Sequence, residues 1–373
     1  MPAPTAPCPP RPIEAILWGT MNVVSRIAFA AALALAAPGL AQAAETRQVA
    51  EFGPNPGHLR MYKRVPDGLP AGAPLVVALH GCTQSAAAFD DDSGWAGLAD
   101  RFRFALLLPE QQKANNDALC FNFFRDEDNR RGQGEAASIR SMIATMVAKH
   151  GLDPSRVYVT GLSAGGAMTA VMLAAYPDVF AAGAIIAGLP YGCASTGGNP
   201  VLEAYRMWYV WNPYLGEAAW AASRCGISRG VPPFPPAPHD PDEWRQLALE
   251  AGGADYATHG WPKVSIWQGG ADRTVYPSNL VELVEQWTAL HGIDRKPDQS
   301  ETGPTYRHDS YAAAAGVVEV EAYELPKLGH AVPVDPGTSP EQCGIAADEH
   351  FEDEDVCAAL RIARFWGVAI PPH

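Results

Sequence analysis

Short apolar runs alternate with helical patterns over most of this chain, and that alternation limits the folds open to it. The runs at 75–81 ("LVVALHG") and 104–110 ("FALLLPE") are almost continuously apolar. Strands that are apolar on both faces are typical of parallel sheets covered by helices on both sides. Further strands are predicted at 156–162, 182–189, 263–269 and 317–325, with helices at 135–151, 164–176, 278–291 and 356–367. The sequence therefore predicts an α/β protein with a doubly wound, mostly parallel sheet and helices on both faces.

The N-terminal segment has the pattern of an export signal. A short polar stretch begins at Met21, which is a candidate start, an apolar segment follows at 27–41, and the triplet "AQA" supplies the small residues of a cleavage site. The apolar segment is too short to span a bilayer, so a removed signal is favoured over a stable membrane anchor. We predict that residues 1–44 are an extension plus signal peptide, cleaved near Ala43 or Ala44, and that the protein is periplasmic or extracellular.

Residues 45–373 are predicted to form a single domain with an insert at about 191–262, where the alternation breaks. The insert holds an aromatic cluster at 204–225 and a proline-rich stretch at 230–244. Two compatible interpretations are a cover over the sheet edge and a wall over a substrate cleft, because aromatic side chains offer flat apolar contact area. The candidates for cleft walls are three tryptophans, for which burial in the core is the alternative: Trp208, Trp211 and Trp267.

The charge balance narrows the choice of partners. The chain carries a formal net charge of -14 and has no basic stripe, which argues against a nucleic-acid partner. An acidic surface also disfavours binding to anionic lipid. Neutral or weakly charged substrates are expected.

Six of the seven cysteines lie beyond the predicted signal, and only Cys8 lies before its start. An even number in an exported chain predicts up to three disulfides, although the sequence leaves their pairing open. No C-x-x-C pair occurs, so no metal site is predicted. The acidic run at 348–355 lacks the calcium-loop pattern D-x-[DN]-x-[DN]-G, and a solvated surface is favoured there.

The stretch "YVTGLSAGGAM" at 158–168 joins a β-branched run to an alanine-rich helical pattern. Within it, residues 161–165 match the pattern G-x-S-x-G. A sharp strand-to-helix turn needs small residues beside the serine, and the following helix directs its N-terminal N–H groups to the same place. We therefore predict that Ser163 is a nucleophile, and a purely structural turn is the alternative.

A serine hydroxyl needs a base, and the base needs an orienting acid. In a chain with this elbow the expected order is serine, acid, histidine. Asp272 is the predicted acid, because it follows a predicted strand and a double glycine. The alternative is that Asp272 only forms the turn that enters the next helix. The other candidates lie in irregular stretches: Asp240, Asp242 and Asp255.

His330 is the predicted base, because it follows a strand and a glycine among apolar residues, and a hydrogen-bonded loop histidine is the alternative. Four other histidines fit less well, since they lie at a helix end, in polar or acidic stretches, or at the chain end: His291, His308, His350 and His373.

The turn "LHGC" at 79–82 is the expected source of a second oxyanion donor. Backbone N–H groups of Cys82 and Ala164 would then stabilise a tetrahedral oxyanion. His80 precedes the elbow, so we favour a role in shaping this turn by hydrogen bonds over a role as base. His80 is also a candidate substrate-binding residue.

These motifs resemble the esterase family of poly(3-hydroxybutyrate) depolymerases, and secreted feruloyl and acetylxylan esterases are similar as well. The stretches that carry the resemblance are "LVVALHGCTQ" (75–84), "ALLLPEQQ" (105–112), "CFNFF" (120–124), "RGQGEAASI" (131–139), "VTGLSAGGAMT" (159–169), "IIAGLPYGCA" (185–194), "WQGGADRTV" (267–275) and "LGHAVP" (329–333). The resemblance implies a secreted α/β-hydrolase with no cofactor or metal and a catalytic triad of Ser163, Asp272 and His330. It also implies an oxyanion hole at Cys82 and Ala164 and three disulfides: Cys82–Cys120, Cys193–Cys225 and Cys343–Cys357.

Two departures from the family bear on the substrate. Enzymes of the family that attack crystalline polymer usually add a linker and a substrate-binding domain, and neither is seen in this sequence. The aromatic insert is of a kind that varies within the family, so the family's substrate-binding residues are not assigned to it. We predict a secreted serine esterase acting on amorphous poly(3-hydroxybutyrate), related short-chain polyhydroxyalkanoates or their oligomers. The alternative is a feruloyl or acetylxylan esterase acting on plant polysaccharide esters. A non-catalytic binding protein of this fold is disfavoured because both the serine and the histidine are present. The oligomeric state is not predicted.

Overall fold

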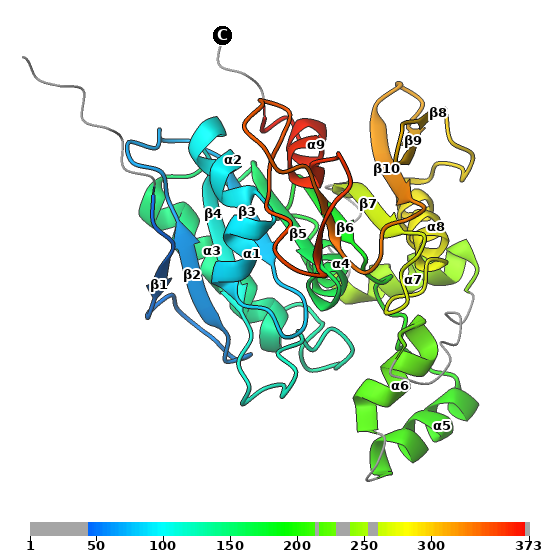
Figure 1. Cartoon of the computed structure of the whole chain (residues 1–373). Coiled ribbons are helices and arrows are strands. Elements are labelled where there is room, and N and C mark those ends of the chain that lie inside the picture. The colour runs from blue at the N-terminus through cyan, green and yellow to red at the C-terminus, as the bar shows by residue number, and fades with distance from the viewer. Residues whose placement is uncertain (1–43, 213–215, 229–238, 253–259, 370–373) are drawn as a thin grey trace, which may run out of the picture. The chain divides into compact units, whose positions relative to one another are not determined.

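The alternating runs build one large sheet, parallel at its centre and antiparallel at its edges (Figure 1). The computed structural model describes residues 44–212, 216–228, 239–252 and 260–369. The strands of this sheet follow the order β1-β2-β4-β3-β5-β6-β7-β10-β9-β8. Their bounds are β1 (Arg47–Val49), β2 (Arg60–Arg64), β3 (Leu75–Leu79), β4 (Ala105–Glu110), β5 (Val157–Leu162), β6 (Ala182–Ile186), β7 (Lys263–Gly269), β8 (Gln299–Thr302), β9 (Arg307–Ala312) and β10 (Val318–Leu325).

Within the described residues, the helices lie between these strands or after the last of them. Their bounds are α1 (Ala86–Asp92), α2 (Trp95–Phe102), α3 (Gly134–His150), α4 (Ala164–Ala175), α5 (Pro200–Trp211), α6 (Gly216–Cys225), α7 (Pro241–Gly252), α8 (Asn279–His291) and α9 (Ala358–Phe365). A separate parallel pair, β11 (Val332–Val334) and β12 (Phe351–Asp353), lies between β10 and α9 in the chain.

Strand β3 illustrates why both faces of the sheet are covered. Successive side chains of a strand point to opposite faces. Val77 and Leu79 belong to an apolar cluster with residues of α3, α4 and α8, whereas Val76 and Ala78 belong to a second cluster with residues of α1, α2 and α9. The α/β architecture predicted from the apolar runs is therefore confirmed: a doubly wound, mostly parallel sheet with helices on both faces.

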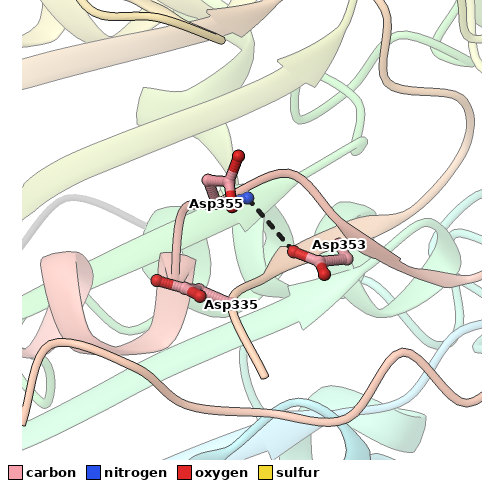
Figure 2. Close-up of side chains that lie close together, drawn as sticks. All are labelled: Asp335, Asp353 and Asp355. Atoms are coloured by element: carbon pink, nitrogen blue, oxygen red, sulfur yellow. Dashed lines mark hydrogen bonds between the residues drawn. The ribbon is translucent and has the colours of Figure 1, made fainter. Parts of the chain in front are cut away.

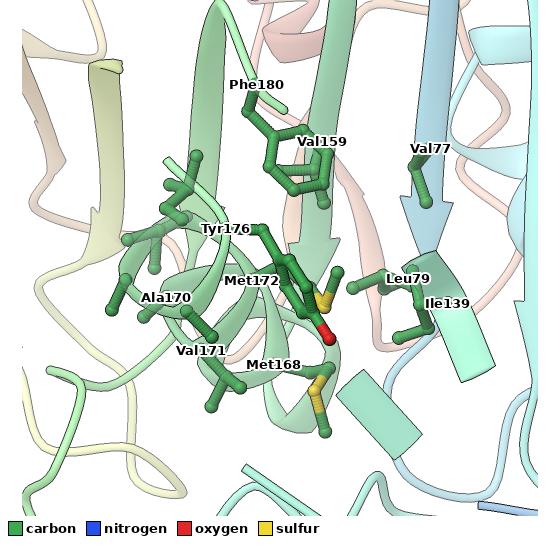
Figure 3. Packing of buried hydrophobic residues seen from close by; sticks show 14 of the residues in the cluster. Val77, Leu79, Ile139, Val159, Met168, Ala170, Val171, Met172, Tyr176 and Phe180 are labelled. Carbon is green, nitrogen blue, oxygen red and sulfur yellow. The ribbon is translucent and has the colours of Figure 1, made fainter. Parts of the chain in front are cut away.

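Helix α4 is the most deeply packed helix near the elbow, since every residue from Ala164 to Ala175 is buried. Figure 3 shows Met168 and Met172 of this helix beside Leu79 and Val159 of the neighbouring strands. Truncating a buried methionine to alanine typically costs about 2–5 kcal/mol. Because α4 is held so firmly, the turn that precedes it is fixed as well.

The predicted strands and helices are confirmed with ends that differ by a few residues, and β6 ends at Ile186 rather than 189. The sequence reasoning missed β1, β2, α1, α2, the insert helices α5, α6 and α7, and the strands β8, β9, β11 and β12. Strand β8, "QSET", is exposed throughout, so no apolar alternation marks it. The missed helices α1 and α2 span 7 and 8 residues, too few for a clear helical periodicity.

Three helices, α5, α6 and α7, occupy the insert predicted at about 191–262. The predicted signal and its cleavage near Ala43 or Ala44 fall on residues 1–43, outside the described part, apart from Ala44 itself. Within the described residues, no helix has both the length and the apolar character needed to cross a bilayer.

Candidate active site

Ser163 occupies the turn between β5 and α4 in a backbone conformation that side chains rarely adopt. Its φ and ψ are 58° and -119°, and its N–H donates to the carbonyl oxygen of Ile186 at 2.9 Å. A positive φ in a residue other than glycine is strained and persists only where the surroundings enforce it. Here the strain matches that of a nucleophile elbow, which lifts a serine hydroxyl above the sheet.

The two glycines of the motif are needed for close packing. A Cβ on Gly161 would lie 2.8 Å from the carbonyl oxygen of Leu79, and one on Gly165 would lie 2.6 Å from that of His80. Both neighbours are backbone atoms of β3 or the turn after it, which cannot move aside without disturbing the sheet. The sequence argument for small residues around Ser163 thus has a specific steric cause.

His330 and Asp272 meet although they are far apart in the sequence. Asp272 follows β7, His330 follows β10, and these two strands are parallel neighbours. The Nδ1 atom of His330 donates to Oδ2 of Asp272 at 2.7 Å. This bond leaves Nε2 of His330 unprotonated in the neutral ring and able to accept a proton.

The carboxylate of Asp272 is held by its own loop and is only 4% exposed. Its Oδ1 accepts the N–H groups of Thr274 at 2.7 Å and Val275 at 2.9 Å. Gln268 donates from Nε2 to Oδ2 at 3.1 Å. These donors fix the direction from which Asp272 holds the imidazole.

Ser163 and His330 line one cavity of about 440 Å³, together with Cys82 and Ala164. Ala164 is the first residue of α4, where backbone N–H groups have no acceptor within the helix. The geometry therefore gathers a serine, a histidine–aspartate pair and two candidate oxyanion donors at one place. The cavity wall also includes Phe123, Phe124, Ala218, Ala221, Ala222 and His350.

The structure joins the three cysteine pairs that the family resemblance implies. The Cα–Cα distances are 4.2 Å for Cys82–Cys120, 5.2 Å for Cys193–Cys225 and 5.5 Å for Cys343–Cys357. The first ties the predicted oxyanion turn to the segment after β4, and the second ties the end of α6 to the loop after β6. Three disulfides fit an exported protein, since such bonds persist in oxidising compartments.

Two predicted substrate-binding residues lie elsewhere, and both predictions need correction. Trp267 is 1% exposed and does not line the cavity, because its ring stacks on Tyr323 at 3.8 Å and its Nε1 donates to Ser265. His80 is also 1% exposed and absent from the cavity wall. Its ring nitrogens instead bond to the backbone of Gly81 and Gln111, as the turn-shaping interpretation predicts.

Trp208 and Trp211 lie on α5 and are 58% and 78% exposed. They do not line the cavity around Ser163, so they are not its walls. Helix α5 packs against α6, where Tyr209 meets Trp220 edge to face at 5.7 Å. The small side chains of α6, rather than the tryptophans of the insert, form the cavity wall on this side.

The sequence reasoning missed three kinds of cavity residue. The alanines of α6 have no chemical signal of their own, and His350 is hidden in an acidic run. Phe123 and Phe124 come from the stretch "CFNFF", whose aromatic density was a usable signal. Buried Glu135, at the start of α3, was also missed. Burial raises the pKa of Glu135 to about 8.

Asp335, Asp353 and Asp355 form an acidic cluster near β12, shown in Figure 2. One carboxylate oxygen from each lies within 4.8 Å of the others, and Asp355 donates its N–H to Oδ1 of Asp353 at 3.2 Å. Exposed carboxylates commonly gather without a ligand, and we assign none here.

Comparisons with known proteins agree with this geometry. The family model "Esterase PHB depolymerase" matches residues 63–203. Poly(3-hydroxyalkanoate) depolymerase C of Paucimonas lemoignei is 46% identical over 91% of this chain and 74% of its own length. Feruloyl esterase B of Talaromyces stipitatus is 31% identical over 79% of this chain and 74% of its own length.

The fold is shared with the solved structure of an acetyl xylan esterase from Aspergillus awamori, with a TM-score of 0.65 and 24% identity over 87% of this chain and 100% of the other. These relatives are carboxylic-ester hydrolases by name, and the protein is an enzyme of that class. The chain belongs to the esterase PHB depolymerase family of α/β-hydrolases.

Proposed function

We propose that this protein is an exported serine esterase that cleaves polyester chains through an acyl-enzyme. The observation that carries the proposal is the hydrogen bond between Asp272 and His330, which lines the same cavity as the strained Ser163. Nε2 of His330 removes the proton of the Ser163 hydroxyl, and Oγ attacks the ester carbonyl. Asp272 holds the imidazole in the required tautomer and stabilises its charged form.

The N–H groups of Cys82 and Ala164 stabilise the oxyanion of the tetrahedral intermediate. One such donor is worth roughly 3 kcal/mol in related chemistry. His330 then protonates the leaving alcohol, and a water molecule repeats the sequence on the acyl-enzyme to release the acid. This scheme needs neither a metal nor an organic cofactor.

The preferred substrate is amorphous poly(3-hydroxybutyrate), another short-chain polyhydroxyalkanoate or its oligomers. The depolymerase relative supports this choice. Methyl-sized side chains on the α6 wall leave room for a polymer chain. Helix α5 adds exposed apolar residues at helical spacing, which suit contact with an uncharged polyester surface: Val201, Tyr205, Trp208 and Trp211.

A feruloyl or acetylxylan esterase is the second candidate, favoured by the Talaromyces relative. We further propose cleavage near Ala43 or Ala44 and release into the periplasm or the medium, followed by folding of residues 45–373 as a single catalytic domain.

The test uses the protein produced with its own N-terminal segment, alongside a Ser163→Ala variant. Each is added to a suspension of amorphous poly(3-hydroxybutyrate) granules, and turbidity is followed, with p-nitrophenyl butyrate as the soluble ester. Clearing by the wild type alone supports the depolymerase. Cleavage of the soluble ester without clearing removes the polymer assignment and directs the test to methyl ferulate and acetylated xylan. Residual turnover by the variant contradicts the role of Ser163.

A further inference from the structure

The peptide unit between Gly81 and Cys82 is clamped from the inside of the protein. The carbonyl oxygen of Gly81, which belongs to this peptide unit, accepts a hydrogen bond from Nδ1 of His80 at 2.7 Å. In the preceding peptide unit, the Gly81 N–H donates to Oε1 of Gln84 at 2.7 Å. In a planar trans peptide the C=O and the next N–H point in opposite directions. Holding the Gly81 oxygen toward His80 therefore fixes the direction of the Cys82 N–H.

The contacts of His80 determine its tautomer. A carbonyl oxygen can only accept, so Nδ1 of His80 must carry the proton. Nε2 accepts the backbone N–H of Gln111 at 3.1 Å, so it is unprotonated. Burial lowers the pKa of His80, more than its bond to Gly81 and the nearby Glu110 raise it. The ring is therefore neutral. It packs against the ring of Phe121, with 4.9 Å between the two ring centroids.

Gln111 is held in turn by Glu135, which is 0% exposed. Nε2 of Gln111 donates to Oε1 of Glu135 at 2.5 Å and to the carbonyl oxygen of Cys120 at 3.0 Å. Asn122 donates to Glu135 from its backbone N–H at 2.8 Å and from Nδ2 at 2.7 Å. One buried chain of bonds thus connects α3 to the turn that bears Cys82.

We propose that His80 is a positioning residue, held in the Nδ1–H tautomer by Gln111 and Glu135, and that it aims the Cys82 N–H into the oxyanion site. The inference rests on the proposed function, because it assumes an ester hydrolysed at Ser163. A preorganised donor acts mainly on the charged transition state. Its loss therefore lowers kcat and leaves KM nearly unchanged.

Two variants separate the donor from the acceptor of the imidazole. In His80→Asn the amide lies where Nδ1 was and can still donate to Gly81. In His80→Gln the amide lies near the former Nε2 and can still accept from Gln111, but the bond to Gly81 is lost. The control is His291→Gln on α8, where another histidine bonds to a backbone carbonyl, that of Pro262, at 3.0 Å.

With p-nitrophenyl butyrate, we expect kcat of His80→Gln to fall about 50-fold or more, toward the ~10²–10³-fold cost of removing an oxyanion donor. His80→Asn should stay within about tenfold of the wild type, and KM of both should change less than about twofold. His291→Gln should keep the wild-type kcat. Equal losses in the two His80 variants, a larger loss in His80→Asn, or a loss expressed in KM would overturn the proposal.

A second measurement needs no variant to fold. Nitrogen NMR of the ¹⁵N-histidine-labelled wild type distinguishes a protonated from an unprotonated ring nitrogen. We expect a neutral His80 with the proton on Nδ1, and a proton on Nε2 overturns the inference. The Ser163→Ala variant distinguishes failure of the proposed function from failure of the positioning role. If Ser163→Ala stays active, the proposed function is wrong. If Ser163→Ala is inactive while His80→Gln keeps the wild-type kcat, only the positioning role of His80 is wrong.

Discussion

Nδ1 of His330 lies 2.7 Å from Oδ2 of Asp272, although 58 residues separate them in the chain. The contact exists because β7 and β10 are parallel neighbours whose C-terminal ends open at the same edge of the sheet. It determines which nitrogen of His330 is free to work as a base.

Asp272→Asn should fold normally and lose most of its activity. The amide oxygen can still accept the N–H groups of Thr274 and Val275, whereas its NH₂ group faces His330 and favours the wrong tautomer. By analogy with such a change in other triads, kcat for p-nitrophenyl butyrate should fall about 10³–10⁴-fold. The control is Asp178→Asn, which removes an ion pair with Arg131 outside the cavity. A loss below about tenfold would mean that Asp272 does not orient the base.

Gly165→Ala should destabilise the fold through backbone crowding. The new Cβ would lie 2.6 Å from the carbonyl oxygen of His80, and overpacking of a tight site costs about 1–3 kcal/mol or more. Urea titration measures the free energy of unfolding. Gly97→Ala on α2 is the matched control, because its Cβ would meet nothing within 4 Å, and a helical glycine-to-alanine change stabilises by up to about 1 kcal/mol. Equal stability of the two variants would contradict the crowding argument.

The double variant Trp208→Ser/Trp211→Ser tests the exposed face of α5. If this face contacts polyester, the ratio of granule clearing to soluble-ester turnover should fall at least about fivefold, and less protein should sediment with the granules. Val281→Ser on α8 is the control, since Val281 is also an exposed apolar helix residue, at 56%. An unchanged ratio would show that α5 has no part in polymer contact.

The raised pKa of Glu135 predicts a pH dependence of stability. Its ordinary value is 4.5, and burial raises the pKa to about 8 in the folded protein, with Asp128 adding to the effect. Between these values the unfolded chain has released a proton that the folded protein keeps, so rising pH favours unfolding. The contribution of Glu135 is largest below about pH 4.5 and is lost by about pH 8, at up to about 1.4 kcal/mol per pH unit.

Urea titrations of the wild type and Glu135→Gln from pH 5 to 9 isolate this contribution, because the glutamine does not titrate. The difference in unfolding free energy between the two proteins should fall with pH and level off above about pH 8. A difference that stays constant would mean that Glu135 is already ionised in the folded protein.

The parallel sheet and the elbow could be predicted from local patterns in the sequence. Short, continuous apolar runs such as 75–81 are typical of buried strands, and a sharp local turn requires the small residues around Ser163. Asp272 and His330 were also predicted as the acid and the base of one site, because each follows a predicted strand and both come after Ser163 in the expected order. Exposed strands such as β8 carried no such signal, because neither of their faces is buried.

Which aromatic and polar residues belong to the site depends on how distant segments pack together. Trp267 looked like a cleft wall, but the pleat of β7 directs its ring onto Tyr323 in the core. The alanines of α6 and His350 reach the cavity through packing of segments distant in sequence. The chain Glu135–Gln111–His80 likewise depends on bonds that no local pattern encodes, since each partner is brought in by a different element.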